Sequence, residues 1–154
     1  MLTRTPKLLI VEDNPDHTEM IQIALSSDNL LNKIYTVTNG EEALDYLYRR
    51  GEYIDKSKSP RPSLVLLDIK LPRIDGFEVL RHIKSDENLK SIPVILLTTS
   101  TEKSEIKRGY EYGANSYVTK PLRFGEFMDR VKNIYTYWIL TNLLPTMEHN
   151  GYSD

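Results

Sequence analysis

Acidic, hydroxyl and lysine side chains follow directly after four short apolar runs of this sequence. The runs cover residues 7–11, 63–67, 94–97 and a late stretch around Tyr117. The polar residues that follow them are Glu12 with Asp13, Asp68, Thr98 and Lys120. If the runs are parallel strands, their carboxyl ends meet at one edge of a sheet. Three carboxylates, a hydroxyl and an ammonium group would then share one cleft.

This set of groups suits phosphoryl transfer assisted by a metal ion. Two carboxylates about 4 Å apart repel by roughly 4 kcal/mol at an effective dielectric near 20, and a hard divalent cation removes that conflict. Asp13 and Asp68 are expected to bind Mg²⁺ directly, while Glu12 acts through a water molecule. A free oxygen of Asp68 can then attack a phosphorus atom, and Mg²⁺ and Lys120 offset the developing negative charge. The Thr98 hydroxyl can donate a hydrogen bond to the resulting aspartyl phosphate.

The elements that must position these groups alternate between strand and helix. Continuous apolar runs rich in branched residues are typical of strands covered on both faces. Such runs surround Leu8, Ile34, Leu64, Val94 and Tyr117. Segments with helical spacing lie between and after them, around residues 20–25, 43–48, 77–83, 106–110 and 124–138. Five alternations predict an α/β fold, a doubly wound five-stranded parallel sheet with helices on both faces.

At these positions the sequence resembles the receiver domain of two-component response regulators. The motifs that carry the resemblance are VEDN at 11–14, LDIKLP at 67–72 with DG at 75–76, LTT at 97–99, and a late stretch from GA at 113–114 to KP at 120–121. The resemblance extends from about residue 7 to residue 138. It implies a flavodoxin-like, CheY-like fold with strand order 2-1-3-4-5, and a sensor histidine kinase as the partner.

The resemblance also implies a task for each residue of the site. Asp68 would be the phosphoacceptor, and Lys120 would pair with the phosphoryl group. Asp13 and Asp68 would bind Mg²⁺ together with the backbone carbonyl of Lys70, and Glu12 would assist. The Lys70 side chain would either point to solvent, or lean on the phosphoryl oxygens or block the attacking water.

The same resemblance assigns a conformational switch to Thr98 and Tyr117. The phosphoryl group would draw in the Thr98 hydroxyl, and the Tyr117 ring would turn into the freed volume. The alternative is that Tyr117 is a core aromatic with no moving part. By the same analogy the peptide bond between Lys120 and Pro121 is expected to be cis, although only about 5–6% of X-Pro bonds are cis in folded proteins.

Two further segments resemble a narrower subgroup, the small regulators paired with bacterial phytochromes. They are a polar insert at residues 51–62 and an apolar ending at residues 137–145. This likeness implies a receiver domain over residues 1–138 and a C-terminal extension over residues 139–154. The extension would form a homodimer together with the last strand and last helix, and would end in a frayed tail at residues 146–154. Taken alone, the insert is predicted to be a surface loop.

The composition is that of a single domain. The chain has 154 residues, a net charge of −2 and no cysteine, which fits a reducing compartment and an expected cytoplasmic location. The sequence lacks a dense basic stripe for nucleic acid, and no apolar run approaches the ~20 residues that span a bilayer. The three histidines, His17, His82 and His149, are expected to lie on the surface.

Three other functions use a related fold or chemistry. A phosphohydrolase of the haloacid dehalogenase kind needs a second aspartate two residues after the nucleophile, where this chain has Lys70. A flavodoxin-like FMN carrier needs a phosphate-binding loop after the first strand, where this chain has EDNP at 12–15. A degenerate receiver would serve only as a docking module. The receiver interpretation instead predicts a signalling protein, not an enzyme beyond its own phosphorylation and dephosphorylation, whose output is contact with another protein or dimerisation.

Overall fold

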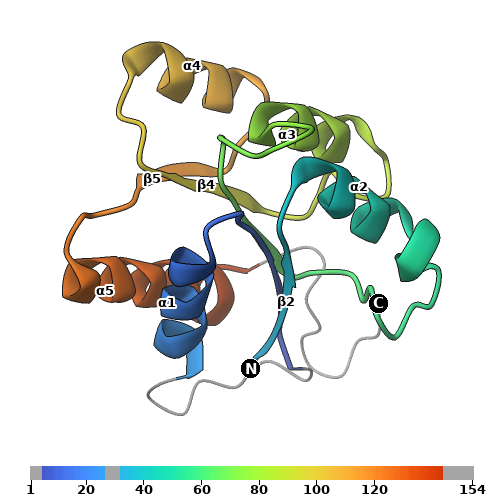
Figure 1. Ribbon diagram of the computed structural model, residues 1–154, viewed down its shortest axis with the longest axis horizontal. Coiled ribbons are helices and arrows are strands. Elements are labelled where there is room, and N and C mark those ends of the chain that lie inside the picture. Colours follow the sequence, from blue (N-terminus) through green and yellow to red (C-terminus); the bar gives the residue numbers. More distant parts are fainter. Residues whose placement is uncertain (1–4, 27–31, 144–154) are drawn as a thin grey trace.

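Five parallel strands form one sheet in the order β2-β1-β3-β4-β5 (Figure 1). The computed structural model describes residues 5–26 and 32–143. The strands are β1 (Lys7–Val11), β2 (Lys33–Val37), β3 (Leu64–Leu67), β4 (Val94–Thr98) and β5 (Ser116–Thr119). The predicted fold class, the strand order and the position of every strand are confirmed. The carboxyl ends of all five strands therefore lie at one edge of the sheet.

Helices cover both faces of this sheet. They are α1 (Pro15–Ser26), α2 (Gly40–Tyr48), α3 (Gly76–Ser85), α4 (Lys103–Glu111) and α5 (Phe124–Tyr135). Helices α1 and α5 lie together on one face, and α2, α3 and α4 lie on the other (Figure 1). None of the described helices is both long and apolar enough to cross a bilayer.

Alternation along the strands divides the core into two apolar layers. In β1, Leu8 and Ile10 pack toward α1 and α5, whereas Leu9 and Val11 pack toward α2 and α3. The central strands β3 and β4 are buried along their whole length, and the edge strands β2 and β5 are partly exposed. This explains why the central strands are continuous apolar runs in the sequence.

Polar caps start three helices just beyond the carboxyl ends of strands. The side chains of Asn14, Asn39 and Asp75 each accept a hydrogen bond from a backbone amide two or three residues further on. Such caps satisfy amides that have no partner inside the helix. They fix where α1, α2 and α3 begin, and so fix the first turn of each helix relative to the edge of the sheet.

Two segments carry more structure than predicted. The insert at residues 51–62 is mostly exposed, as predicted for a surface loop, but it begins with a short 3₁₀ helix (Gly51–Tyr53) and packs on α2. Ser59 is fully buried and donates to the Tyr53 carbonyl at 2.8 Å, and the Tyr46 hydroxyl donates to the Pro60 carbonyl at 2.8 Å. The last helix, expected to reach residue 138, ends at Tyr135 and continues as a wider π-helical segment, Thr136–Thr141.

Candidate functional site

The Lys120 ammonium is the centre of the site at the carboxyl edge of the sheet. It donates to Glu12 Oε1, to Asp68 Oδ2 at 2.8 Å and to His17 Nδ1 at 3.0 Å. The side chains of Lys120 and Glu12 are only 2% and 3% exposed. An ammonium group has three N–H donors and no acceptor, so all three donors of Lys120 are used.

Three carboxylates gather around this lysine. One oxygen from each of Glu12, Asp13 and Asp68 lies within 4.8 Å of the other two. One ammonium leaves two of these negative charges without a counter-charge. Glu12 and Asp68 are buried, while Asp13 is exposed, so the cluster is open to solvent on one side. An all-oxygen donor set with this excess of negative charge suits a hard divalent cation.

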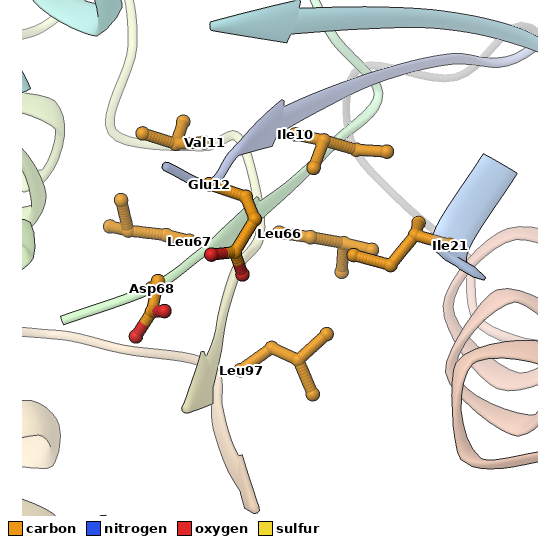
Figure 2. Close-up of a pocket in the computed structure, with 8 residues that line it drawn as sticks. All are labelled: Ile10, Val11, Glu12, Ile21, Leu66, Leu67, Asp68 and Leu97. Atoms are coloured by element: carbon orange, nitrogen blue, oxygen red, sulfur yellow. The ribbon is translucent and has the colours of Figure 1, made fainter. Parts of the chain in front are cut away.

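An apolar floor lies beneath the carboxylates. Figure 2 shows Glu12 and Asp68 at the ends of β1 and β3, beside apolar side chains from the layer that faces α1 and α5. The floor consists of Ile10, Ile21, Leu66 and Leu97. Burial in this surrounding raises the pKa of the Glu12 carboxyl, and the Lys120 ammonium opposes that rise. The floor therefore strengthens the electrostatic contacts of the site by excluding water.

The backbone holds Asp68 in a defined orientation. Its Oδ1 accepts a hydrogen bond from the Ile69 amide at 2.7 Å, while Oδ2 faces Lys120. The start of α3 approaches closely, because a Cβ atom at Gly76 would lie 2.1 Å from the Asp68 carbonyl oxygen. Only glycine permits that approach. The DG motif at residues 75–76 thus supplies a helix cap and the space in which Asp68 sits.

The two predicted switch residues lie on β4 and β5, the two strands beyond β3 in the sheet. Thr98 is buried at the end of β4, and its hydroxyl accepts a long hydrogen bond, 3.5 Å, from the Ser100 amide. The Tyr117 hydroxyl donates to the Ser100 carbonyl at 2.9 Å. A Cβ atom at Gly109 of α4 would lie 3.3 Å from the Tyr117 ring, so this glycine gives the ring its space. Tyr117 therefore links β5 to the loop that follows β4.

Three sequence expectations concern His17, the peptide bond before Pro121 and the side chain of Lys70. The prediction that His17 is a surface residue is wrong, because its ring contacts Lys120 and is 26% exposed. The expected cis peptide bond before Pro121 is not found: the described residues contain no cis peptide bond, and trans is the intrinsically favoured isomer. The side chain of Lys70 is exposed, which agrees with a residue that points to solvent. His149 and residues 146–154 lie outside the described residues.

Sequence reasoning missed His17 as a member of the site. The residue lies in the first turn of α1, four positions after Asp13. A helix that starts directly after an acidic pair at a strand end must keep its first turn beside that edge. Position within the chain was thus the available signal, whereas the residue type suggested only a surface histidine.

Comparisons with known proteins place the chain beside response regulators. Residues 8–132 match the response regulator receiver domain. The probable methanogenesis regulatory protein FilR2 of Methanothrix harundinacea is 41% identical over 138 residues, which are 90% of this chain and 86% of FilR2. The response regulator Rcp1 of Synechocystis is 36% identical over 138 residues, which are 90% of this chain and 92% of Rcp1.

Solved structures agree with these matches. The phosphorylated cyanobacterial phytochrome response regulator RcpA superposes with a TM-score of 0.88 at 40% identity, over 92% of this chain and 99% of RcpA. The Mn²⁺-bound form of Rcp1 superposes with a TM-score of 0.84 at 36% identity, over 91% of this chain and 99% of Rcp1.

Proposed function

The chain belongs to the receiver domain family of response regulators, and from that premise we propose that Asp68 accepts a phosphoryl group from a sensor histidine kinase. Receiver domains of this family are signalling proteins rather than enzymes, and they interact with histidine kinases. The observation that carries the proposal is the contact of the Lys120 ammonium with both Asp68 and Glu12 beside a cluster of three carboxylates.

The proposed reaction uses the protein's own side chains as follows. An Asp68 carboxylate oxygen forms a bond to phosphorus while the bond from phosphorus to the donor nitrogen breaks, and the electron pair of that bond leaves with the donor. Negative charge on the phosphoryl oxygens is met by Lys120, which already donates to Asp68 Oδ2. Mg²⁺ held by Asp13, Asp68 and the Lys70 carbonyl, with Glu12 assisting, would supply the remaining positive charge.

A divalent metal suits this cluster, and Mg²⁺ is the proposed ion. At 100 times its dissociation constant, Mg²⁺ should stabilise the protein by about 2.7 kcal/mol. Thermal unfolding followed by circular dichroism should then show a rise in Tm of roughly 5–10 °C. Asp13→Asn should lose most of this rise, because it removes a direct ligand. Asp16→Asn, an exposed acid on α1, is the matched control and should keep it. An equal rise in the Asp13 and Asp16 variants would exclude Asp13 as a ligand.

The alternatives predict different outcomes with acetyl phosphate and Mg²⁺. A phosphoacceptor gains the mass of one phosphoryl group, whereas a phosphohydrolase releases phosphate continuously and a docking module stays unmodified. The complete acidic set with its lysine supports the phosphoacceptor over the degenerate receiver. The side chain of Lys70, where a hydrolase needs its second aspartate, is exposed and cationic.

Output is proposed to pass through the Thr98–Tyr117 switch. Pairing of the Thr98 hydroxyl with a phosphoryl oxygen would draw the end of β4 toward Asp68. Such a shift would disturb the hydrogen bond from Tyr117 to Ser100 and so the face made by α4, β5 and α5. The division into a receiver domain at 1–138 and an extension at 139–154 remains part of the proposal, with the addition that Ile139 is buried in the apolar layer that α1 and α5 cover.

The proposed kinase is a phytochrome, by similarity to RcpA. FilR2, a relative of another signalling context, is about equally similar, so the assay needs two kinases. Phosphotransfer from a phytochrome kinase should be faster than from a histidine kinase without a photoreceptor domain, and should depend on red or far-red light. Equal, light-independent rates would reject the pairing while leaving the phosphoacceptor proposal intact.

A homodimer through β5, α5 and the C-terminal extension is the proposed assembly. Exposed apolar side chains concentrate after β5, at Leu122, Phe124, Tyr137, Leu140 and Leu143. Light scattering in the phosphotransfer assay, before and after transfer, should give the mass of two chains in at least one state. Leu140→Glu should lower that mass, whereas Ile54→Glu, an exposed apolar residue in the insert, should not. One chain mass in both states would reject the dimer.

A further inference from the structure

His17 is the one neutral side chain that accepts a hydrogen bond from Lys120 in the described part of the chain. The other two acceptors, Glu12 and Asp68, are carboxylates. Because an ammonium has no lone pair, the His17 Nδ1 atom must be the acceptor and the Nε2 atom must carry the ring proton. Burial, followed by the Lys120 charge, lowers the pKa of His17, which agrees with a neutral ring.

Two contacts position this imidazole, one to the His17 backbone and one to its ring. The Asn14 side chain caps the first turn of α1 and accepts from the His17 amide at 3.4 Å. The ring lies against Phe127 of α5, with centroids 5.5 Å apart and planes tilted by 41°. The Asn14 backbone N–H in turn donates to Glu12 Oε2 at 3.1 Å. Asn14 therefore helps to position both the backbone of His17 and the carboxylate of Glu12.

We propose that His17 is a positioning residue, which holds the Lys120 ammonium against Asp68 by accepting its third hydrogen bond without adding a charge. The inference rests on the proposed phosphoacceptor role of Asp68. A carboxylate at position 17 would add a fourth negative charge and compete with Asp68 for the ammonium. A water molecule in this place would offer no fixed direction. A neutral ring that lies against Phe127, on a backbone capped by Asn14, gives direction and leaves the charge of the site unchanged.

This arrangement lets the Lys120 ammonium contact Asp68 before phosphorylation and a phosphoryl oxygen after it, with little movement. When Asp68 gains the phosphoryl group, the donor that faces Asp68 can turn to a phosphoryl oxygen. The other two donors stay on Glu12 and His17, so the ammonium is already oriented when charge develops on the phosphoryl oxygens. Loss of the His17 acceptor should slow phosphorylation rather than prevent folding.

The test compares two replacements of His17 with acetyl phosphate as phosphodonor at saturating Mg²⁺. His17→Leu keeps apolar bulk against Phe127 and removes the acceptor, whereas His17→Asn can place an oxygen where Nδ1 lies. His17→Leu should lower the phosphorylation rate about 10- to 100-fold, the size expected for one hydrogen bond to a charged group, and His17→Asn should restore it to within about twofold of the wild type. His82→Leu on α3 is the matched control and should keep the wild-type rate.

A double-mutant cycle separates positioning from packing. In a Lys120→Met background, His17→Leu should change the residual rate by less than about twofold, because the partner of the hydrogen bond is gone. A wild-type rate in His17→Leu, or a rate for His17→Asn as low as that for His17→Leu, would overturn the inference. An undiminished effect in the Lys120→Met background would overturn it as well. A wild-type chain that is never modified at Asp68 would instead overturn the proposed function, and the inference with it.

Discussion

Replacing Asp68 with asparagine should abolish phosphorylation by acetyl phosphate and Mg²⁺. The amide is not a nucleophile toward phosphorus, and Asp68 is the carboxylate at the end of β3 whose Oδ2 contacts Lys120 while its Oδ1 accepts from the Ile69 amide. Asparagine has nearly the same shape, and its oxygen can still accept from the Ile69 amide. Intact-protein mass spectrometry should show the mass gain of one phosphoryl group in the wild type and none in Asp68→Asn.

A nearby aspartate provides the matched control. Asp75 caps α3 seven residues later, and asparagine caps helices as well as aspartate does, so Asp75→Asn should keep both fold and phosphorylation. Peptide mapping after borohydride reduction should locate the modification at Asp68 in the control and the wild type. Undiminished modification of Asp68→Asn would assign the acceptor to another residue and contradict the proposed chemistry.

Replacing Lys120 with methionine should lower the free energy of unfolding by about 3–5 kcal/mol when metal is removed by EDTA. Methionine matches the length and bulk of the lysine stem but leaves the buried carboxylates of Glu12 and Asp68 without their counter-charge. Urea denaturation followed by circular dichroism measures the loss. Saturating Mg²⁺ should return part of it, because the ion supplies positive charge to the same carboxylates.

A half-buried lysine gives the control. The Lys84 ammonium donates to the Lys90 and Ile92 carbonyls and to Asn115 Oδ1, with no carboxylate among these acceptors. Lys84→Met should also destabilise the fold, but Mg²⁺ should stabilise it no more than it stabilises the wild type. A Lys120→Met protein that loses no stability in EDTA would show that solvent, rather than the ammonium, balances the carboxylates.

The drop in the free energy of unfolding of Lys120→Met should depend on pH through the pKa of Glu12. Burial already raises the pKa of this carboxyl above its ordinary value of 4.5, and removal of the opposing ammonium should raise it further. When the pKa of a carboxyl is higher in the folded state than in the unfolded state, the folded state is favoured at pH values below the unfolded-state pKa. This stabilisation is lost as the pH rises through the folded-state pKa. The stability deficit of the variant should therefore be full at neutral pH and shrink as pH is lowered toward 4.5. A deficit that grows on acidification would contradict this assignment.

The sequence by itself determined where the strands lie and which edge of the sheet carries the site residues. Each central strand is buried on both faces, so residues 8–11, 64–67 and 94–97 had to be continuous apolar runs, and the polar residues that end them had to lie at one edge. Asp75 and Gly76 also indicated the start of α3, because a helix cap favours aspartate and the close approach to the Asp68 carbonyl needs glycine. These features were predictable because they depend on local backbone geometry and on the period of the sheet.

Tertiary structure alone decided which side chains meet inside that edge. His17 and Lys120 are 103 positions apart, and their contact depends on how α1 packs on the sheet beside α5, which residue types do not reveal. The insert at 51–62 looked like a polar loop because its buried contacts are single hydrogen bonds to backbone carbonyls, which leave no periodic pattern. Periodicity identifies the face of an element, whereas the angle and depth at which two faces meet are set by the packing of the whole core.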